Sequence, residues 1–283
     1  MRLALGDVQV TVLDAGTLWL DGGAMFGVVP KTIWEKERPC DAKNRILLST
    51  NVLLVEDGKE RLLIDTGAGT NWDEKSIGLY GLDPKSAEEM LSPAGVRPEQ
   101  IDVVVNSHLH FDHAGGNTVR DATGRFVPAF PNASYVVQRG EFELACCRSN
   151  ERTRASYLPE NFEALAADDR FRFVDGDTAL TNHLRVHVAP GHTPHMQVPL
   201  VVTREATVAF LADLVPTASH VPFPYIMAYD LEPLRTLATN KRLLPEAARE
   251  GWYVVFEHDR EIPMGTLEEQ GGRLRARPLK GGL

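Results

Sequence analysis

The sequence predicts a mixed α and β fold, α/β in the broad sense, in a single domain that spans residues 1–283. The chain has 283 residues, of which 43% are hydrophobic, enough for one large sandwich or two small domains. Short β-branched runs alternate with helical stretches along the chain. Candidate metal ligands extend from His108 to His258, so a domain boundary between them would divide their site. One domain is therefore expected.

The expected elements follow from apolar runs and their periodicity. Strands are expected at residues 8–13, 51–55, 61–64, 101–105, 135–138, 184–188, 198–202, 207–211 and 252–256, and helical stretches at 140–167 and 231–250. Residues 19–45 mix glycines with large apolar side chains, which predicts an ordered loop that covers a site or contacts a second subunit. The basic residues 268–283 are expected to form a flexible tail.

Four side chains that commonly bind metals fall within six residues: His108, His110, Asp112 and His113. Because alternate residues of an extended chain point to the same side, His108 and His110 can face one ion. The chain must then turn to bring in Asp112 and His113, and we expect the pair Gly115-Gly116 to allow a turn into a helix near Asn117. This density of ligands predicts a metal site.

Three further candidate ligands each follow an apolar strand. They are His192, Asp213 and His258. Residues at strand ends can meet at one rim of a rigid sheet scaffold, where active sites are commonly built.

The motif His108-x-His110-x-Asp112-His113, followed by Gly191-His192, Asp213 and His258, resembles the metallo-β-lactamase superfamily over nearly the whole chain. The apolar run that ends in Asp65-Thr66-Gly67 is similar to an early strand and turn of this family, in which the Asp supports the metal site from outside. The resemblance implies a four-layer αββα sandwich with the site at one edge of the two sheets.

The resemblance also implies two divalent metal ions. It assigns His108, His110 and His192 to one ion, Asp112, His113 and His258 to the other, and Asp213 to both. Imidazole and carboxylate ligands favour zinc, with iron, manganese or cobalt as alternatives. The implied mechanism is attack by a metal-bridging hydroxide, with Asp112 as a catalytic residue that assists departure of the alkoxide.

Ligand identities narrow the reaction class. Diiron flavoprotein relatives carry Glu in place of the second His, which disfavours a redox enzyme, and a complete ligand set disfavours a non-catalytic protein. The favoured function is hydrolysis of a lactone or carboxylic ester, as in N-acyl-homoserine lactonases. Organophosphate triester hydrolysis and thioester hydrolysis of the glyoxalase II kind remain alternatives.

Residues after Asp213 bear on the substrate. The lactonases usually place a Tyr three residues after this Asp, where the present chain has Pro216. The stretch 213–230 instead resembles the methyl-parathion-hydrolase-like branch, so His220 and Tyr225 are predicted to line the substrate pocket. The alternative is that His220 caps a loop and Tyr225 packs beneath it.

Composition limits the partners. A net charge of −9 without a basic stripe disfavours nucleic acid, and no apolar run approaches the roughly 20 residues that span a bilayer. A cytoplasmic enzyme acting on a small molecule is expected, with a homodimer as an open alternative. The three cysteines, two of them adjacent at 146 and 147, are expected to be reduced and not to bind metal.

Overall fold

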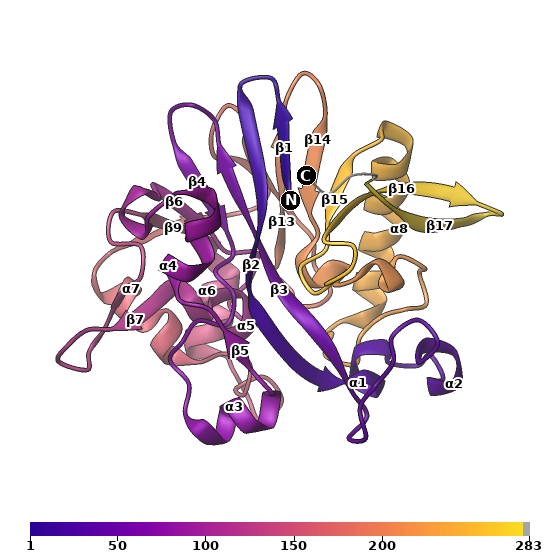
Figure 1. Ribbon diagram of the computed structural model, residues 1–283, viewed down its shortest axis with the longest axis horizontal. Helices are drawn as coiled ribbons and strands as arrows, with labels where there is room; N and C mark the ends of the chain where they lie inside the picture. Colours follow the sequence, from indigo (N-terminus) through magenta and orange to yellow (C-terminus); the bar gives the residue numbers. More distant parts are fainter. Residues whose placement is uncertain (280–283) are drawn as a thin grey trace.

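Two β-sheets pack face to face, with helices on both outer surfaces (Figure 1). The computed structural model describes residues 1–279. The layer order is helix, sheet, sheet, helix, which confirms the predicted αββα sandwich. Among the described residues, no helix combines the length and apolar character needed to cross a membrane.

The first sheet has eight strands in the order β1-β2-β3-β4-β6-β9-β10, with β5 paired to β2. Pairing is antiparallel from β1 to β4 and parallel from β4 through β10. The strands are β1 (Arg2–Leu5), β2 (Val8–Asp21), β3 (Arg45–Glu56), β4 (Arg61–Ile64), β5 (Asp83–Pro84), β6 (Val103–Val105), β9 (Ser134–Gln138) and β10 (Phe171–Val174).

The second sheet has seven strands in sequence order, and its one parallel pair is β14 with β15. A separate hairpin joins β7 (Thr118–Arg120) to β8 (Phe126–Pro128). The strands of the second sheet are β11 (Thr178–Ala179), β12 (Leu184–Val188), β13 (Gln197–Val202), β14 (Thr207–Phe210), β15 (Tyr253–Val255), β16 (Met264–Gln270) and β17 (Arg273–Pro278).

Residues of α4 and α7 pack on the outer face of the first sheet, and residues of α8 pack against the second. The helices are α1 (Gly22–Phe26), α2 (Lys31–Trp34), α3 (Glu74–Tyr80), α4 (Ala87–Leu91), α5 (Phe111–Ala114), α6 (Arg139–Cys147), α7 (Glu163–Ala167) and α8 (Pro233–Glu250). The expected helical stretch at 140–167 is thus two shorter helices, whereas the one at 231–250 is close to α8.

The central strands are apolar on both faces because each face meets a separate core. In β3, Leu53 and Val55 belong to the core between the sheets, whereas Val52 and Leu54 belong to the core beneath α4. Successive side chains of a strand point to opposite faces, which explains this division. Strands buried on both faces read as continuous hydrophobic runs, as residues 52–55 of β3 do.

Residues 19–45 form ordered structure. They contain the end of β2, the helices α1 and α2, and the first residue of β3. Met25, Phe26 and Trp34 anchor the segment in a separate apolar cluster and are almost completely buried. Gly27, with a φ of +55°, permits the turn between Phe26 and Trp34, and the large side chains fix the segment against the body of the protein.

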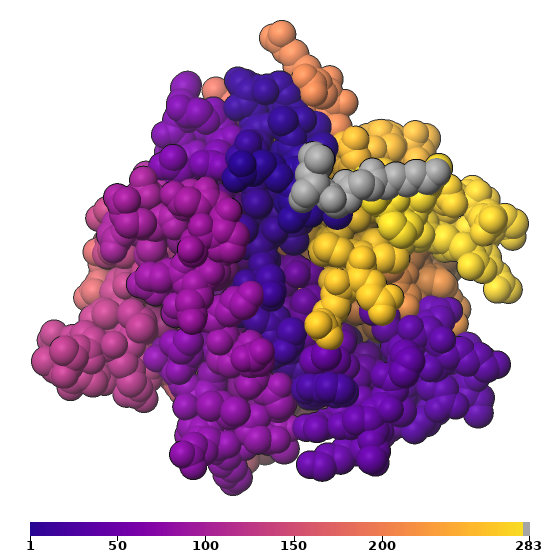
Figure 2. All heavy atoms as spheres, in the orientation of Figure 1, coloured from indigo at the N-terminus to yellow at the C-terminus, as the bar shows by residue number. Residues whose placement is uncertain are grey.

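The C-terminal residues correct one prediction. Residues 268–278 do not form a flexible tail: β16 and β17 pair over six residue pairs, with a turn at Gly271-Gly272. Leu267 is buried, and Leu274 packs against the same core, while the basic side chains face outward. The hairpin projects at the side of the second sheet (yellow, Figure 2). The remaining predicted tail residues, 280–283, lie outside the described residues.

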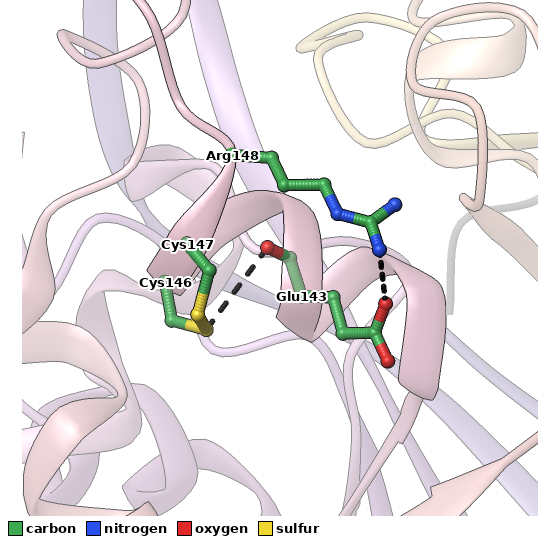
Figure 3. Close-up of a disulfide and its surroundings, with 4 residues drawn as sticks. All are labelled: Glu143, Cys146, Cys147 and Arg148. Atoms are coloured by element: carbon green, nitrogen blue, oxygen red, sulfur yellow. Dashed lines mark hydrogen bonds and ion pairs between the residues drawn. A yellow bond between two sulfur atoms is a disulfide. The ribbon is translucent and has the colours of Figure 1, made fainter.

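The cysteine prediction is also corrected. The adjacent Cys146 and Cys147, at the end of α6, are joined by a disulfide (Figure 3). Beside them, Arg148 donates a hydrogen bond of 2.9 Å to the Glu143 carboxylate. Because the disulfide joins sequence neighbours, it closes no loop between distant segments and constrains the unfolded chain little. Cys40 is a free cysteine.

The helix after the histidine motif starts earlier than predicted. α5 begins at Phe111, and the chain near Asn117 has already passed from a 3₁₀ turn toward β7. Gly116 allows its backbone to lie close to that of Thr66, because a Cβ at position 116 would lie 2.3 Å from the carbonyl oxygen of Thr66. The pair Gly115-Gly116 therefore lets α5 pack directly against the turn after β4.

We expect Gly116→Ala to destabilise the fold by about 1–3 kcal/mol, because the added methyl group overpacks a backbone contact. Gly78→Ala is the matched control, since Gly78 lies on the exposed side of α3 with open space around its Cβ position. Alanine there should be neutral or stabilising by about 0.5–1 kcal/mol. Chemical denaturation of the two variants measures both effects. Equal stability of Gly116→Ala and the wild type would contradict the packing argument.

Candidate metal centre

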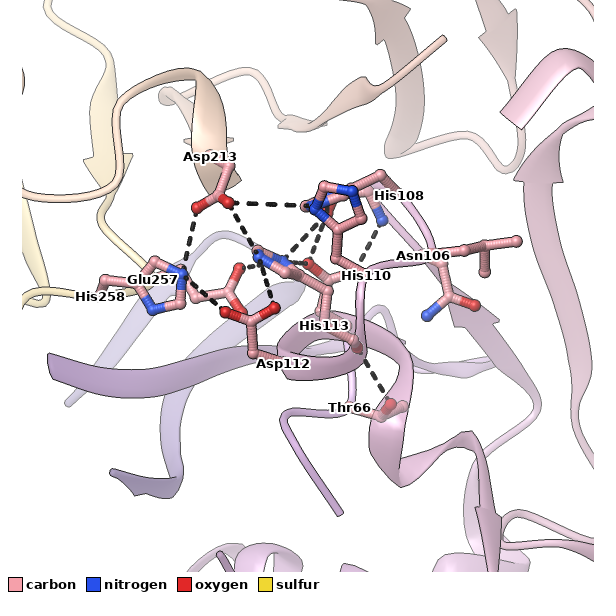
Figure 4. A network of polar contacts seen from close by, with 12 residues as sticks. Thr66, Asn106, His108, His110, Asp112, His113, Asp213, Glu257 and His258 are labelled. Atoms are coloured by element: carbon pink, nitrogen blue, oxygen red, sulfur yellow. Dashed lines mark hydrogen bonds and ion pairs between the residues drawn. The ribbon is translucent and has the colours of Figure 1, made fainter. Parts of the chain in front are cut away.

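All seven predicted ligands converge at one edge of the sandwich, where loops from the two sheets meet. Figure 4 labels each of them except His192. Each side chain is buried. They lie at or just after strand ends: His108 and His110 after β6, Asp112 and His113 on α5, His192 between β12 and β13, Asp213 in the 3₁₀ helix η5 (Ala212–Leu214) after β14, and His258 after β15.

One group consists of His108, His110, His192 and Asp213. The Nδ1 atom of His110 lies 2.9 Å from Nε2 of His192, and that nitrogen lies 3.0 Å from Oδ2 of Asp213. Ligand atoms from all four residues lie within 4.8 Å of one another. This spacing is suitable for one ion.

Asp112, His113 and His258 form a second group. Nε2 of His258 lies 3.7 Å from Oδ2 of Asp112 and 3.1 Å from Oδ1 of Asp213. Nε2 of His113 lies 3.4 Å from Oδ2 of Asp213. The Asp213 carboxylate thus contacts imidazoles of both groups, and it can serve two ions at once.

Unpaired buried atoms support cation binding. Among the described residues, Nε2 of His108, Nε2 of His113 and Oδ1 of Asp213 are buried without a hydrogen-bond partner. Buried polar atoms are rarely left unpaired, because each then loses its interactions with water. All three atoms belong to side chains that converge on the centre (Figure 4), where divalent ions would satisfy them. The donor set of imidazoles and carboxylates fits zinc and similar metals.

The pKa shifts of His108, His110 and Asp213 suit cation binding, whereas for His113, His192 and His258 nearby carboxylates outweigh burial and raise the pKa. Burial, reinforced by neighbouring imidazoles, holds the pKa of His108 and of His110 well below the ordinary histidine value. Burial would raise the pKa of Asp213, but the imidazoles of His192, His113 and His258 outweigh it and hold that pKa well below its usual range. Neutral imidazole and ionised carboxylate are the forms that bind metals.

Outer contacts hold the ligand rings in place. Nδ1 of His113 lies 3.0 Å from Asp65, which also accepts hydrogen bonds from the backbone and hydroxyl of Ser107. Nδ1 of His258 donates to the carbonyl oxygen of Ser49 at 2.7 Å. Such partners fix the orientation and basicity of metal-binding imidazoles.

The N-terminal end of α8 holds His192. Nδ1 of His192 lies 3.0 Å from Asp230, whose other oxygen accepts the Thr236 hydroxyl group of α8. Gly191 brings the loop against this helix, because a Cβ there would lie 2.3 Å from the Thr236 hydroxyl oxygen. Glycine is therefore required before His192 because a side chain at position 191 would overlap with Thr236.

Two buried carboxylates that contact ligand imidazoles were not predicted from the sequence. Asp230 lies far along the chain from His192, and no local pattern marks it. Glu257 lies 2.7 Å from Nδ1 of His113 and is completely buried. Burial, opposed by the nearby imidazole of His113, raises the pKa of Glu257 to about 8. Its one sequence signal is its position directly before His258.

A cavity of about 360 Å³ opens onto the centre. His110, Asp112, His192, Asp213 and His258 line its metal-facing side. Its other walls are mainly apolar and come from the 19–45 segment, the end of α3, the start of α5, the region between α6 and α7, and residues 227–231. They include Leu20, Met25, Tyr80, Phe111, Arg152, Met227, Tyr229 and Leu231.

The two predicted substrate contacts lie elsewhere. His220 is buried: its Nε2 donates to the carbonyl oxygen of Met25 at 2.9 Å, and its ring stacks on Phe26 with centroids 4.6 Å apart. Burial lowers the pKa of His220 to about 4, so the ring is neutral. Tyr225 lines a separate cavity beside α8 and the β16–β17 hairpin, and its ring meets Phe26 edge-on. Both side chains support the 19–45 segment from beneath, which corrects the prediction that they line the metal-facing pocket.

Known proteins are similar to this chain in sequence. The family model of the metallo-beta-lactamase superfamily matches residues 45–258. An N-acyl homoserine lactonase of Bacillus cereus is 29% identical over 228 residues, which cover 75% of this chain and 82% of that protein. A second N-acyl homoserine lactonase, from a Bacillus species, is 30% identical over 232 residues, with the same coverage of both chains.

Solved structures share the fold. A probable metal-dependent hydrolase from Staphylococcus aureus superposes with a TM-score of 0.89 at 27% identity, covering 99% of this chain and all of that one. An N-acyl homoserine lactone hydrolase with N-hexanoyl-L-homoserine bound at its catalytic metal center has a TM-score of 0.64 at 25% identity, covering 89% and 93% of the two chains.

Metal affinity should increase with pH. Burial lowers the pKa of His258, but the carboxylates of Asp213, Glu257 and Asp112 outweigh it and raise this pKa to about 9 in the metal-free protein. A metal ion must therefore displace a proton at neutral pH, and proton competition weakens as pH rises from 6 to 8. Competition with a chromophoric chelator at several pH values measures this trend, and His187→Gln, at a half-exposed histidine, should leave it unchanged. A pH-independent affinity, corrected for the chelator's own protonation, would contradict the prediction.

Proposed function

The chain belongs to the metallo-β-lactamase superfamily of metal-dependent hydrolases, and we propose on that basis that it uses two divalent metal ions, with zinc favoured, to open a lactone ring or cleave a carboxylic ester. The observation that carries the proposal is the Asp213 carboxylate, which contacts imidazoles of both ligand groups. A single shared carboxylate between two buried groups is suited to a two-metal site.

The residue assignments follow from the two groups. His108, His110 and His192 would hold one ion, Asp112, His113 and His258 the other, and Asp213 both. Two ions held in this way would lower the pKa of a bound water molecule and polarise the bond to be cleaved.

Asp112 is the catalytic acid and base of this proposal. Asp112 lines the cavity, so its carboxylate can contact a bound substrate as well as His258. It can take up the proton released on attack and deliver it to the departing alkoxide oxygen. In a lactone, that oxygen stays on the same molecule as the new carboxylate.

Phenol groups are available for substrate binding. Burial and the nearby Asp112 carboxylate raise the pKa of Tyr80. Burial, with Asp21 and Asp112 among the nearby charges, likewise raises the pKa of Tyr229. Both hydroxyl groups stay protonated at neutral pH and can donate hydrogen bonds to a carbonyl oxygen. These two tyrosines supply phenol groups in the cavity, whereas the chain has Pro216 at the position where lactonases usually have a Tyr.

The cavity favours a substrate with an apolar portion. Leu20, Met25 and Met227 provide an apolar wall, and methionine side chains adapt well to variable shapes. The relatives named N-acyl homoserine lactonase point to a lactone that carries an acyl chain. We therefore place lactones first, then carboxylic esters, with phosphotriesters and thioesters as alternatives.

A substrate screen tests the proposal. The wild type is expected to hydrolyse an acyl lactone at least about 100-fold more efficiently than an aryl ester, a thioester or a phosphotriester of similar size, a difference of about 2.7 kcal/mol in transition-state binding. Asp213→Asn, purified in parallel, is the matched blank, and we expect its kcat/KM to fall by at least about 1000-fold because the shared carboxylate is lost. Metal analysis accompanies each sample. An Asp213→Asn protein that has lost an ion but keeps wild-type activity would overturn the two-metal mechanism, and a strong preference for phosphotriesters would overturn the lactone assignment.

The cavity assignment predicts different effects at two tyrosines. Tyr229→Phe removes a hydrogen-bond donor from the metal-facing cavity and should lower kcat/KM for the lactone about tenfold, the effect of losing one hydrogen bond. Tyr225→Phe is the control, because Tyr225 lies in the separate cavity, and it should stay within about twofold of the wild type. Steady-state kinetics on both variants decides the question. The reverse order of effects would return Tyr225 to the substrate pocket.

A further inference from the structure

Glu141 of α6 is a completely buried carboxylate that belongs to neither ligand group. Its Oε1 atom accepts hydrogen bonds from the Tyr157 hydroxyl group at 2.8 Å and from the Leu109 backbone N–H at 3.3 Å. Its Oε2 atom accepts the Thr193 hydroxyl group at 2.6 Å. A buried carboxylate is costly unless hydrogen bonds replace its lost water, and here three donors from three separate segments do so.

Each of the three donors to Glu141 lies next to a ligand of the first group, either in sequence or through ring contact. Leu109 lies between His108 and His110, and Thr193 directly follows His192. The ring of Tyr157 lies against the ring of His110, with centroids 4.7 Å apart and planes inclined by 61°. These three histidines are the imidazoles of the first group.

The second group is held by other residues. His113 contacts Asp65 and Glu257 through Nδ1, and His258 donates to the Ser49 carbonyl oxygen. None of the three donors to Glu141 is adjacent in sequence to these two histidines. A substitution of Glu141 should therefore disturb the ligands of the first group more than those of the second.

We propose that Glu141 is a positioning residue for the first metal ion: it ties together the loop after β6, the loop between β12 and β13, and the segment between α6 and α7, so that His108, His110 and His192 face one point. The inference rests on the two-metal centre of the proposed function. It assigns to Glu141 a role that acts through the three histidines, without contact to substrate.

A conservative and a disruptive variant separate charge from hydrogen bonding. In Glu141→Gln, the amide oxygen can still accept from Leu109 and Tyr157, and the Thr193 hydroxyl group can turn to accept from the amide nitrogen. Glu141→Leu fills a similar space but leaves the Leu109 N–H buried without a partner. The amide should rescue what leucine loses.

Metal binding is the readout. Zinc affinity is measured by competition with a chelator, and the site that is lost is identified from the visible absorption of the cobalt-substituted protein. In Glu141→Leu we expect one ion to bind about 10- to 100-fold more weakly, the range typical for loss of an outer partner, with the other ion within about threefold of the wild type. The one-cobalt spectrum of Glu141→Leu should match that of His110→Ala, which lacks a ligand of the first group, and differ from that of His258→Ala.

A pair of tyrosine variants provides an independent test if Glu141→Leu does not fold. Tyr157→Phe removes one donor to Glu141 and should weaken the same ion severalfold. Tyr135→Phe is the matched control: its hydroxyl group is also buried and hydrogen-bonded, to the carbonyl oxygen of Asn117 at 3.1 Å, but it does not contact Glu141.

The results discriminate between the two proposals. Equal weakening of both ions, or unchanged binding of both in Glu141→Leu and Tyr157→Phe, would overturn the positioning role, because a general structural contact makes no distinction between the groups. A wild-type protein that binds fewer than two ions would instead overturn the proposed function, and this inference with it.

Discussion

The Asp213 carboxylate is the interaction on which the site depends. Its two oxygens lie within 3.4 Å of imidazole nitrogens of His192, His113 and His258, so one side chain joins ligands delivered by both sheets. The chain that carries it is constrained: Ala212 has a φ of +46°, a conformation that residues other than glycine rarely adopt. Backbone strain of this kind is typical of functional sites, where surrounding structure enforces a particular side-chain position.

The ligands lie on loops, but the two sheets determine where those loops meet. β6 belongs to the first sheet, whereas β12, β14 and β15 belong to the second. The core between the sheets therefore sets the distance between His110 and His192, which lie 82 residues apart in sequence. Metal binding and sheet packing are coupled in this arrangement, because each brings together the same segments.

The two halves of the centre differ in how they are supported. Around His113, two buried carboxylates, Asp65 and Glu257, face a single imidazole nitrogen. The first group is held by a wider network that runs through Glu141 and Asp230 to helices α6 and α8. The cavity side is apolar and includes part of the 19–45 segment, which His220 and Tyr225 support from beneath.

The sequence by itself predicted nine strands of the two sheets and, through its resemblance to a known family, the αββα class and the seven candidate ligands. Those ligands could be found because strand ends and the compact motif at residues 108–113 are local patterns, which can be recognised from the order of residues alone. The tertiary structure alone decided the rest. Glu141, Asp230 and Glu257 touch ligand segments through non-local contacts that no spacing records. His220 turned toward the carbonyl oxygen of Met25, and the basic C-terminal residues paired as a hairpin over a partly apolar face. In each case the orientation was set by partners distant in sequence, whose hydrogen bonds and packing exist only once the two sheets have come together.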